Sequence, residues 1–330
     1  MEHGEMENFN GYVENERYYG GNAGAKLGIV YKGENWFLKF GKTTKGFRNM
    51  EISYTTSPLS EYIGSQIYQS IGIPVHETML GERDGKIVVA CKDFRKPGDE
   101  LIEFKSIKNS YVKGREDVTS GDTYGNGVEL SDVLSTIEGN RTLRGIQGAM
   151  DRFWDMFVVD AFISNNDRNN GNWGVLLHSD GTKELSPVYD NGNSFANKKS
   201  DGQLEKTMQN EEALKDSAYR IVTCTYQKNG KLLNPFSYIK ELKNDACMRA
   251  VQRIIPKIDM NKIRRIIQDI PEEYCGIPVM SQTRKEYYLL MLQKRYDEVL
   301  DPVYQTIQKI YEQKKEFYAK PIQPLVTPKI

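Results

Sequence analysis

The sequence of 330 residues is poor in cysteine and histidine, has no excess of charge of either sign and contains no long apolar run. Its four cysteines are widely scattered without a C-x-x-C spacing, and there are only three histidines, which argues against a zinc site or a disulfide framework. Lys plus Arg equals Asp plus Glu at 45 each, so no global field favours nucleic acid, anionic lipid or an acidic substrate as partner. The start of the chain is polar and acidic, unlike a signal peptide, so we expect a cytoplasmic protein that binds neither membrane nor nucleic acid directly. Export by a signal-independent route stays open.

The chain is long enough to bury a sizeable core, as one large domain or as two lobes. Short strand-like runs occupy residues 27–31, 36–40 and 86–90. Between the second and the third lies S-P-L-S-E-Y-I-G-S-Q-I-Y-Q-S-I-G, where Ser57 can cap a helix, Pro58 fits its first turn and Gly72 follows its end. We therefore expect a small β-rich N-lobe with one key helix over residues 1–108.

The second half has a different pattern. Residues 109–128 are rich in Gly, Ser, Asp and Asn and indicate an exposed loop between lobes. Apolar residues recur at helical spacing from Met150 to Phe162, which predicts a central helix of a larger lobe over residues 129–320. The last ten residues, 321–330, contain three prolines and are expected to form a tail. The predicted fold class is α+β, with two lobes.

A polar stretch, N-N-D-R-N-N-G-N-W-G (165–174), follows that helix and precedes a strand-like run. W-G-V-L-L-H, the turn S-D-G and K-E-L-S-P-V-Y predict a hairpin with a two-residue loop at Asp180 and Gly181. Antiparallel pairing would then place Asn172 opposite Tyr189, next to Asp190. Together with Asp167, these oxygen donors suit a divalent cation that is bound jointly with phosphates.

The spacing D-x-x-x-x-N, followed after a hairpin by D-x-G, is the arrangement of the catalytic and metal-binding loops of protein kinases. Asp167 fits the carboxylate that receives the hydroxyl proton, and Asn172 and Asp190 fit the metal ligands. Either motif alone is more simply interpreted as a polar turn that hydrogen-bonds to itself. The two motifs in this order around a hairpin favour phosphate transfer.

The residues that bind the nucleotide should precede these loops in the sequence. G-G-N-A-G-A-K offers small residues and backbone N–H groups to phosphates, although it is not a Walker motif. Lys39 occupies a strand position from which it could reach phosphates, and Glu61 in the following helix could pair with it. In isolation Lys39 is more simply a solvent-facing strand residue and Glu61 a favourable charge near a helix start. The strand that ends at 88–94 could form a hinge to the second lobe that contacts the base, although it is more simply a core strand. The candidate nucleotide-binding residues are therefore Gly20, Gly21, Asn22, Gly24, Lys26 and Lys39, together with Ala90, Cys91, Lys92 and Phe94 of this hinge.

These segments resemble the HipA-like serine/threonine kinases, and within that group the compact CtkA-type kinases. The resemblance covers residues 20–270 and is most specific in F-W-D-M-F-V-V-D-A-F-I-S-N-N-D-R-N-N-G-N-W-G. The other segments that carry it are G-G-N-A-G-A-K, F-L-K-F, S-E-Y, K-I-V-V-A-C-K-D-F, P-V-Y-D-N-G-N-S and I-P-K-I-D-M-N-K-I. It implies a two-lobed kinase-like fold, ATP with Mg²⁺ or alternatively Mn²⁺, and phosphate transfer to Ser or Thr of a protein, with autophosphorylation. The same resemblance assigns Asp167 as base, Asn172 and Asp190 as metal ligands, Lys39 as the ATP lysine and Glu61 as its partner.

The chain departs from the family pattern at one position and from the motifs of eukaryotic kinases at two others. Asn169 follows Arg168 where a histidine is common, and Asn166 precedes the catalytic Asp, unlike the H-R-D order of eukaryotic kinases. Asn191 replaces the Phe of D-F-G, which puts the packing switch of that motif in question. Many relatives are toxins neutralised by a small antitoxin, so an antitoxin-type partner is implied.

Two alternatives to a protein kinase follow from the same residues. A small-molecule or lipid kinase could use a similar constellation, although no basic amphipathic segment supports lipid docking. A pseudokinase would bind nucleotide or a partner without catalysis. Ser194 and Ser200 lie where an activation segment would run and are candidate autophosphorylation sites.

Overall fold

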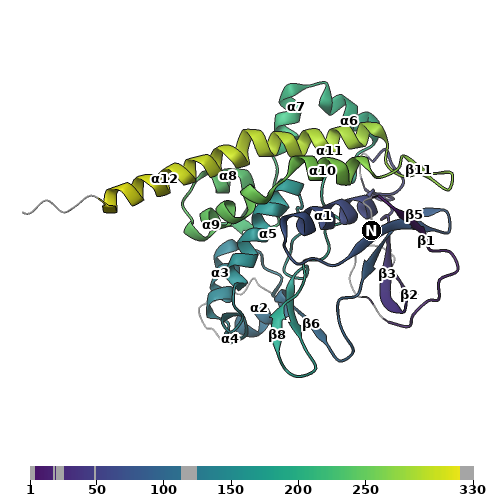
Figure 1. Cartoon of the computed structure of the whole chain (residues 1–330), viewed down its shortest axis with the longest axis horizontal. Coiled ribbons are helices and arrows are strands. Elements are labelled where there is room, and N and C mark those ends of the chain that lie inside the picture. Colours follow the sequence, from purple (N-terminus) through teal and green to yellow (C-terminus); the bar gives the residue numbers. More distant parts are fainter. Residues whose placement is uncertain (1–3, 18, 20–25, 48–49, 113–124, 320–330) are drawn as a thin grey trace, which may run out of the picture.

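The computed structural model describes residues 4–17, 19, 26–47, 50–112 and 125–319. It has a β-rich region and a larger helical region, with helix α1 between them (Figure 1). This is the predicted α+β arrangement. Among the described residues, every helix is too short or too polar to cross a lipid bilayer.

The N-terminal region is built on a five-stranded sheet in the order β1-β4-β5-β3-β2. The strands are β1 (Met6–Asn8), β2 (Lys26–Tyr31), β3 (Glu34–Phe40), β4 (Thr78–Arg83) and β5 (Lys86–Lys92). The three strands predicted from the sequence are confirmed, whereas β1 and β4 were not predicted. Strand β4 contains Gly81, where an added Cβ would lie 2.2 Å from the Glu7 carbonyl oxygen and 2.3 Å from the Phe9 ring. This glycine weakens the strand pattern but lets β1 pair closely with β4.

Helix α1 (Ser57–Ile71) packs against this sheet and against the helical region, and eleven of its fifteen residues are buried. Gly72 ends it in the left-handed conformation with a φ of 83°, as predicted, and Pro58 lies in its first turn. The predicted cap is wrong: Thr56 is the capping residue and makes no side-chain capping bond. The Ser57 hydroxyl lies inside the first turn, where it accepts a hydrogen bond from the Thr55 hydroxyl at 3.0 Å.

A second sheet links the two regions. Its strands are β6 (Glu100–Glu103), β7 (Gly174–Leu177) and β8 (Lys183–Leu185), in the order β6-β7-β8. Residues 100–103 therefore share a sheet with the C-terminal region, although the sequence division at 109–128 groups them with the N-lobe. Residues 109–112, which were predicted to belong to a loop, instead form the end of helix α2 (Phe104–Val112).

The hairpin between β7 and β8 has a longer loop than expected. Leu177 pairs with Lys183, and the His178 N–H donates to the Thr182 carbonyl at 2.9 Å, which leaves three residues in the loop. Gly181 adopts a φ of 85°, and the Asp180 carboxylate accepts the Thr182 N–H at 2.8 Å. The register is therefore shifted by one residue, and Asn172 is not paired with Tyr189.

The C-terminal region is mostly helical, as predicted. Helix α5 (Ala149–Ile163) lies in its core and carries the predicted apolar residues. The other α-helices are α3 (Leu130–Gly139), α4 (Arg141–Arg144), α6 (Asp201–Met208), α7 (Glu211–Lys215), α8 (Pro235–Lys240), α9 (Asp245–Ile254), α10 (Met260–Gln268), α11 (Gln282–Arg295) and α12 (Asp301–Ala319). Short elements complete the region: η2 (Asp216–Arg220), η3 (Ile255–Lys257), η4 (Tyr296–Leu300), β9 (Gln227–Lys228), β10 (Lys231–Leu232), β11 (Glu273–Tyr274) and β12 (Ile277–Pro278).

Candidate active site

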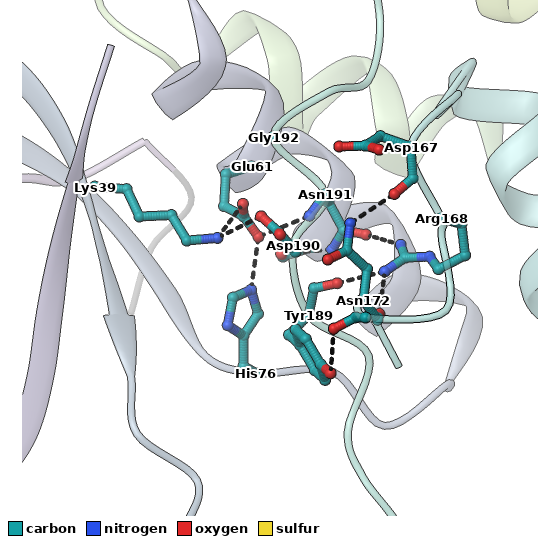
Figure 2. A network of polar contacts seen from close by, with 12 residues as sticks. Lys39, Glu61, His76, Asp167, Arg168, Asn172, Tyr189, Asp190, Asn191 and Gly192 are labelled. Carbon is teal, nitrogen blue, oxygen red and sulfur yellow. Dashed lines mark hydrogen bonds and ion pairs between the residues drawn. The ribbon is translucent and has the colours of Figure 1, made fainter. Parts of the chain in front are cut away.

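The polar stretch after α5 is organised around one buried arginine. The Arg168 guanidinium is 2% exposed and binds both carboxylate oxygens of Asp160 in α5, at 2.9 and 3.1 Å. It also donates to the carbonyls of Asn172 and Tyr189 and to the side-chain oxygen of Asn191 (Figure 2). This one side chain therefore fixes the polar stretch (165–174), the D-N-G segment (190–192) and α5 relative to one another.

Lys39 of β3 lies between two carboxylates. Its Nζ is 2.7 Å from Glu61 Oε2 in α1 and 2.9 Å from Asp190 Oδ1 in the D-N-G segment (Figure 2). Burial acts to lower the pKa of Lys39, but Asp190 and Glu61 outweigh it, so the pKa lies above its ordinary value. Lys39 is therefore a firmly charged link between three elements rather than a solvent-facing strand residue.

Glu61 has a partner on each side. Its Oε1 lies 2.9 Å from His76 Nε2 and accepts the backbone N–H of Asn191 at 2.9 Å, while Oε2 faces Lys39. Burial acts to raise the pKa of Glu61, but Lys39 and His76 outweigh it and hold the pKa well below its usual range. The carboxylate is therefore charged and fixed in orientation.

Asn191, in the position of the Phe of D-F-G, is a polar connector. It is fully buried, its side-chain nitrogen donates to the Ser65 hydroxyl of α1 at 3.0 Å, and its side-chain oxygen accepts from Arg168. An added Cβ on Gly64 of α1 would lie 2.9 Å from the Asn191 Cβ, so the two segments are in close contact. The link between α1 and the polar stretch 165–174 is thus made by the hydrogen bonds of Asn191 rather than by an aromatic ring.

Asp167 lies at the edge of the site and is half-buried. Burial raises the pKa of its carboxyl, and the hydrogen bond from Asn169 opposes that rise. The Asn169 side-chain nitrogen donates to Asp167 Oδ1 at 2.9 Å. Asn169 therefore orients the carboxylate.

Asn172 and Asp190 both line one cavity of about 430 Å³. The Asn172 side-chain nitrogen donates to the Asp167 carbonyl at 2.6 Å, which leaves its amide oxygen as the atom able to ligate a cation. Asp190 has a φ of 62°, an uncommon backbone conformation for a residue other than glycine. Amide and carboxylate oxygens form the donor set that hard divalent cations prefer.

The cavity also contains Lys26, Lys39 and Phe94 from the candidate nucleotide-binding set, and its wall includes Tyr19 and Phe37. A second cavity of about 230 Å³ adjoins it, shares Lys39 and Asp190, and contains Asp167 and Lys198. The two cavities therefore meet at the Lys39–Asp190 pair.

The predicted hinge residues are only partly at this cavity. Ala90 and Cys91 are fully buried within the sheet, and Lys92, at the end of the central strand β5, pairs with Glu34 at 2.8 Å and with Glu77 at 3.3 Å. Phe94 alone of these four lies on the cavity wall. Gly20, Gly21, Asn22 and Gly24 lie outside the described residues.

Of the two candidate autophosphorylation sites, Ser194 is fully buried, which argues against its modification in this conformation. Ser200 caps α6, with its hydroxyl accepting the Gln203 N–H at 3.2 Å.

Four residues that organise the site were not predicted from the sequence: His76, Asp160, Arg168 and Asn191. Asp160 carried a usable signal, because a carboxylate on the buried face of an apolar helix requires a partner. His76 lies in I-P-V-H-E, which has no motif.

Known proteins are similar to this chain in sequence and fold. The model of the HipA-like C-terminal domain family matches residues 20–270. The serine/threonine-protein kinase CtkA of Helicobacter pylori strain J99 is 32% identical over 311 residues, which cover 94% of this chain and 90% of that protein. The crystal structure of a Helicobacter pylori proinflammatory kinase CtkA superposes with a TM-score of 0.82 at 31% identity, covering 93% of this chain and 99% of the other.

A more distant structure shares the fold. The Shewanella oneidensis MR-1 toxin–antitoxin system of HipA, HipB and operator DNA matches with a TM-score of 0.51 at 14% identity, over 91% of this chain and 70% of the other. The family match and the CtkA relative together establish that this chain belongs to the HipA-like C-terminal domain family.

Proposed function

We propose that this chain is an ATP-dependent serine/threonine protein kinase. The observation that carries the proposal is the position of Lys39 Nζ, 2.7 Å from Glu61 and 2.9 Å from Asp190, where two cavities meet. The larger cavity contains Asn172 and the smaller contains Asp167. Nucleotide in the first and an acceptor hydroxyl in the second would meet at these charged groups, as phosphate transfer requires.

The residues of the larger cavity fit a nucleotide with a divalent cation. Tyr19 and Phe37 stack with ring centroids 4.5 Å apart, and Phe94 lies on the same cavity wall, so an apolar surface is available to a base. Lys26 and Lys39 offer positive charge to phosphates. We assign Asn172 and Asp190 as ligands of Mg²⁺, with Mn²⁺ as the alternative. When bound, the cation neutralises charge that develops between the phosphates.

Asp167 is assigned as the group that receives the acceptor proton. The hydroxyl oxygen forms the new bond to the γ-phosphorus, the bond from that phosphorus to the β-phosphate oxygen breaks, and the proton passes to the Asp167 carboxylate. Burial raises the pKa of Asp167, which makes its carboxylate a better base than an exposed aspartate. The hydrogen bond from Asn169 turns the carboxylate into a fixed direction.

The acceptor is proposed to be a serine or threonine hydroxyl of a protein, on the basis of the curated name of the CtkA relative. We also propose a protein partner of the antitoxin kind, because the HipA relative of the same fold was crystallised with HipB.

Phosphate transfer from γ-labelled ATP tests the proposed function. The purified chain is incubated with Mg²⁺ and ATP, alone and with a mixture of dephosphorylated proteins, and the labelled amino acid is identified after acid hydrolysis. Phosphoserine or phosphothreonine is the expected product. Nucleotide-dependent thermal stabilisation without any labelled protein would instead indicate a small-molecule kinase or a pseudokinase, and absence of stabilisation would overturn nucleotide binding itself.

A further inference from the structure

A separate cavity of about 160 Å³ lies between α11, the end of α5 and the segment that follows Gly192. Its lining includes Ser164, Phe195, Lys199, Ser217, Tyr287 and Arg295. None of its lining residues belongs to either of the two active-site cavities. In Figure 1, α11 lies close to α6, which begins directly after this segment.

Arg295 is buried in this wall without a counter-charge. It is 3% exposed, and its hydrogen bonds go to the backbone carbonyls of Ala218 at 2.8 Å, Phe162 at 2.9 Å and Ser217 at 3.4 Å. Burial lowers the pKa of Arg295 to about 10, and within the described residues no carboxylate offsets that effect. A guanidinium has five N–H donors, so these three bonds leave donors available to a further acceptor.

Two other buried arginines among the described residues, in contrast to Arg295, each have a carboxylate partner. Arg168 binds Asp160 through two nitrogens, and Arg284 binds Asp201 at 2.7 Å. A buried charge without an opposite charge is costly, since the desolvation of the ion is not compensated. The cavity beside Arg295 is therefore where a compensating anion would be most favourable.

Lys199 adds a second positive charge to the same wall. It is half-buried, and burial lowers its pKa without any carboxylate contributing among the described residues. The hydroxyl-bearing residues Ser164 and Ser217 also line the cavity. Two cationic residues and two hydroxyl-bearing residues around one cavity form a donor-rich site, as oxyanion ligands require.

Two of the lining residues have uncommon backbone conformations. Ser164 has a φ of 57° and Phe195 a φ of 56°, and the Phe195 N–H donates to the Ile163 carbonyl at 2.9 Å. For Ser164 this is the conformation of a helix C-cap, because Ser164 ends α5, whereas for Phe195 it is an uncommon conformation of the kind found at ligand and switch sites. Ser164 directly precedes the catalytic loop, and Phe195 follows the D-N-G segment, so the cavity touches both.

We propose that this cavity binds a tetrahedral oxyanion of the phosphate class, with Arg295 and Lys199 as its counter-charges. The cavity volume of about 160 Å³ is several times the roughly 30 Å³ that one water molecule occupies in the liquid, so the cavity has room for such an ion. The bound anion holds the segment around Phe195 against the end of α5 and thereby stabilises the start of the catalytic loop. The ion is either free phosphate or the phosphoryl group of a modified serine or threonine. This site is additional to phosphate transfer and does not depend on it.

Calorimetric titration with inorganic phosphate tests the site, with Mg²⁺ and a non-hydrolysable ATP analogue present to occupy the active-site cavities. We expect saturable binding to the wild type and about tenfold weaker binding to Lys199→Gln, which loses one charge-assisted contact. Lys206→Gln, a change at an exposed lysine of α6, is the matched control and should bind like the wild type. The Lys199 variant is used because Arg295 supports three carbonyls, and its replacement risks unfolding the chain.

A second titration with N-acetyl-phosphoserine amide distinguishes the two sources of the ion. Tighter binding of the phosphoserine compound identifies a modified side chain as the ligand, and tighter binding of inorganic phosphate identifies the free ion. Absence of saturable binding of both at millimolar concentration overturns the proposal. Equal affinity of the wild type and Lys199→Gln for phosphate also overturns it, because the ion then binds elsewhere.

Discussion

Replacement of Arg168 by methionine tests whether this residue holds the active-site loops together. Met fills a similar length of buried space but removes all five hydrogen bonds that the guanidinium makes to Asp160, Asn172, Tyr189 and Asn191. The change leaves the Asp160 carboxylate buried, at 4% exposure, without its opposite charge.

The expected loss in unfolding free energy is large. Removal of one partner from a buried ion pair costs about 3–5 kcal/mol. Asp160 keeps hydrogen bonds from the Tyr68 hydroxyl at 2.8 Å and the Asn165 amide at 3.1 Å, which limits its share of the cost. The carbonyls of Asn172 and Tyr189 lose a donor, and a buried group left without a partner costs about 1–3 kcal/mol. We therefore expect a total of at least about 4 kcal/mol, the sum of the lower ends of these two ranges.

Urea unfolding, followed by both tryptophan fluorescence and far-UV circular dichroism, measures this loss, provided that the two transitions coincide. Arg253→Met is the matched control, because Arg253 also binds carboxylates of α5, Asp155 at 2.8 Å and Asp151 at 3.2 Å, but is 31% exposed. An exposed pair contributes less than about 1 kcal/mol.

The double variant Asp160→Asn, Arg168→Met isolates the charge effect. Asn at 160 removes the uncompensated charge, so the double variant should be about 2 kcal/mol more stable than the sum of the single changes predicts. A cost of Arg168→Met no larger than that of Arg253→Met would refute the role of Arg168, as would strict additivity in the double variant.

Three further predictions concern the charged network. Asn169→Ala removes a hydrogen bond that favours the ionised Asp167, so the pKa of that carboxyl should rise, and the acid limb of kcat/KM should move to higher pH; an unmoved limb would exclude Asp167 as the base. Gly64→Ala places a Cβ 2.9 Å from that of Asn191, and chemical denaturation should show a loss of about 1–3 kcal/mol; wild-type stability and activity together would contradict the close contact. Lys39→Met should weaken nucleotide-dependent thermal stabilisation and abolish phosphate transfer, whereas unchanged stabilisation would remove Lys39 from the nucleotide site.

The local pattern of the chain predicts most elements and the order of the motifs. Gly72, Pro58 and the apolar spacing from Met150 to Phe162 predict α1 and α5, because each acts through its immediate neighbours. Strand β4 was not predicted because it contains Gly81, which is unusual in a strand. The reason for this glycine is the close packing of Phe9, a residue far away in the sequence.

The hairpin shows why register is harder to predict than the element itself. The S-D-G turn fits both a two-residue and a three-residue loop, and the Asp180 carboxylate bond to Thr182 decides between them. Asn172 and Asp190 still line the same cavity despite the shifted register. The reason is that Arg168 binds the carbonyls of both Asn172 and Tyr189 at the open end of the hairpin.

The supporting residues of the site could not be predicted because they act through long-range contacts. His76 reaches Glu61 across 15 positions, and Asn191 reaches Ser65 across 126 positions. Neither pairing leaves a periodic pattern in the sequence. Motifs therefore predict the groups that carry the proposed chemistry, whereas the groups that orient them emerge only from the fold.

The most direct test of the proposed mechanism compares kcat for phosphate transfer between the wild type and Asp167→Asn, with the nucleotide Kd measured for both. Asp180→Asn, at the exposed tip of the hairpin, is the control for loss of one carboxylate. We predict that Asp167→Asn lowers kcat by roughly 10²–10⁴-fold with nucleotide affinity retained, while Asp180→Asn transfers phosphate like the wild type. Equal kcat in the wild type and Asp167→Asn would contradict the assignment of Asp167 as the group that receives the acceptor proton.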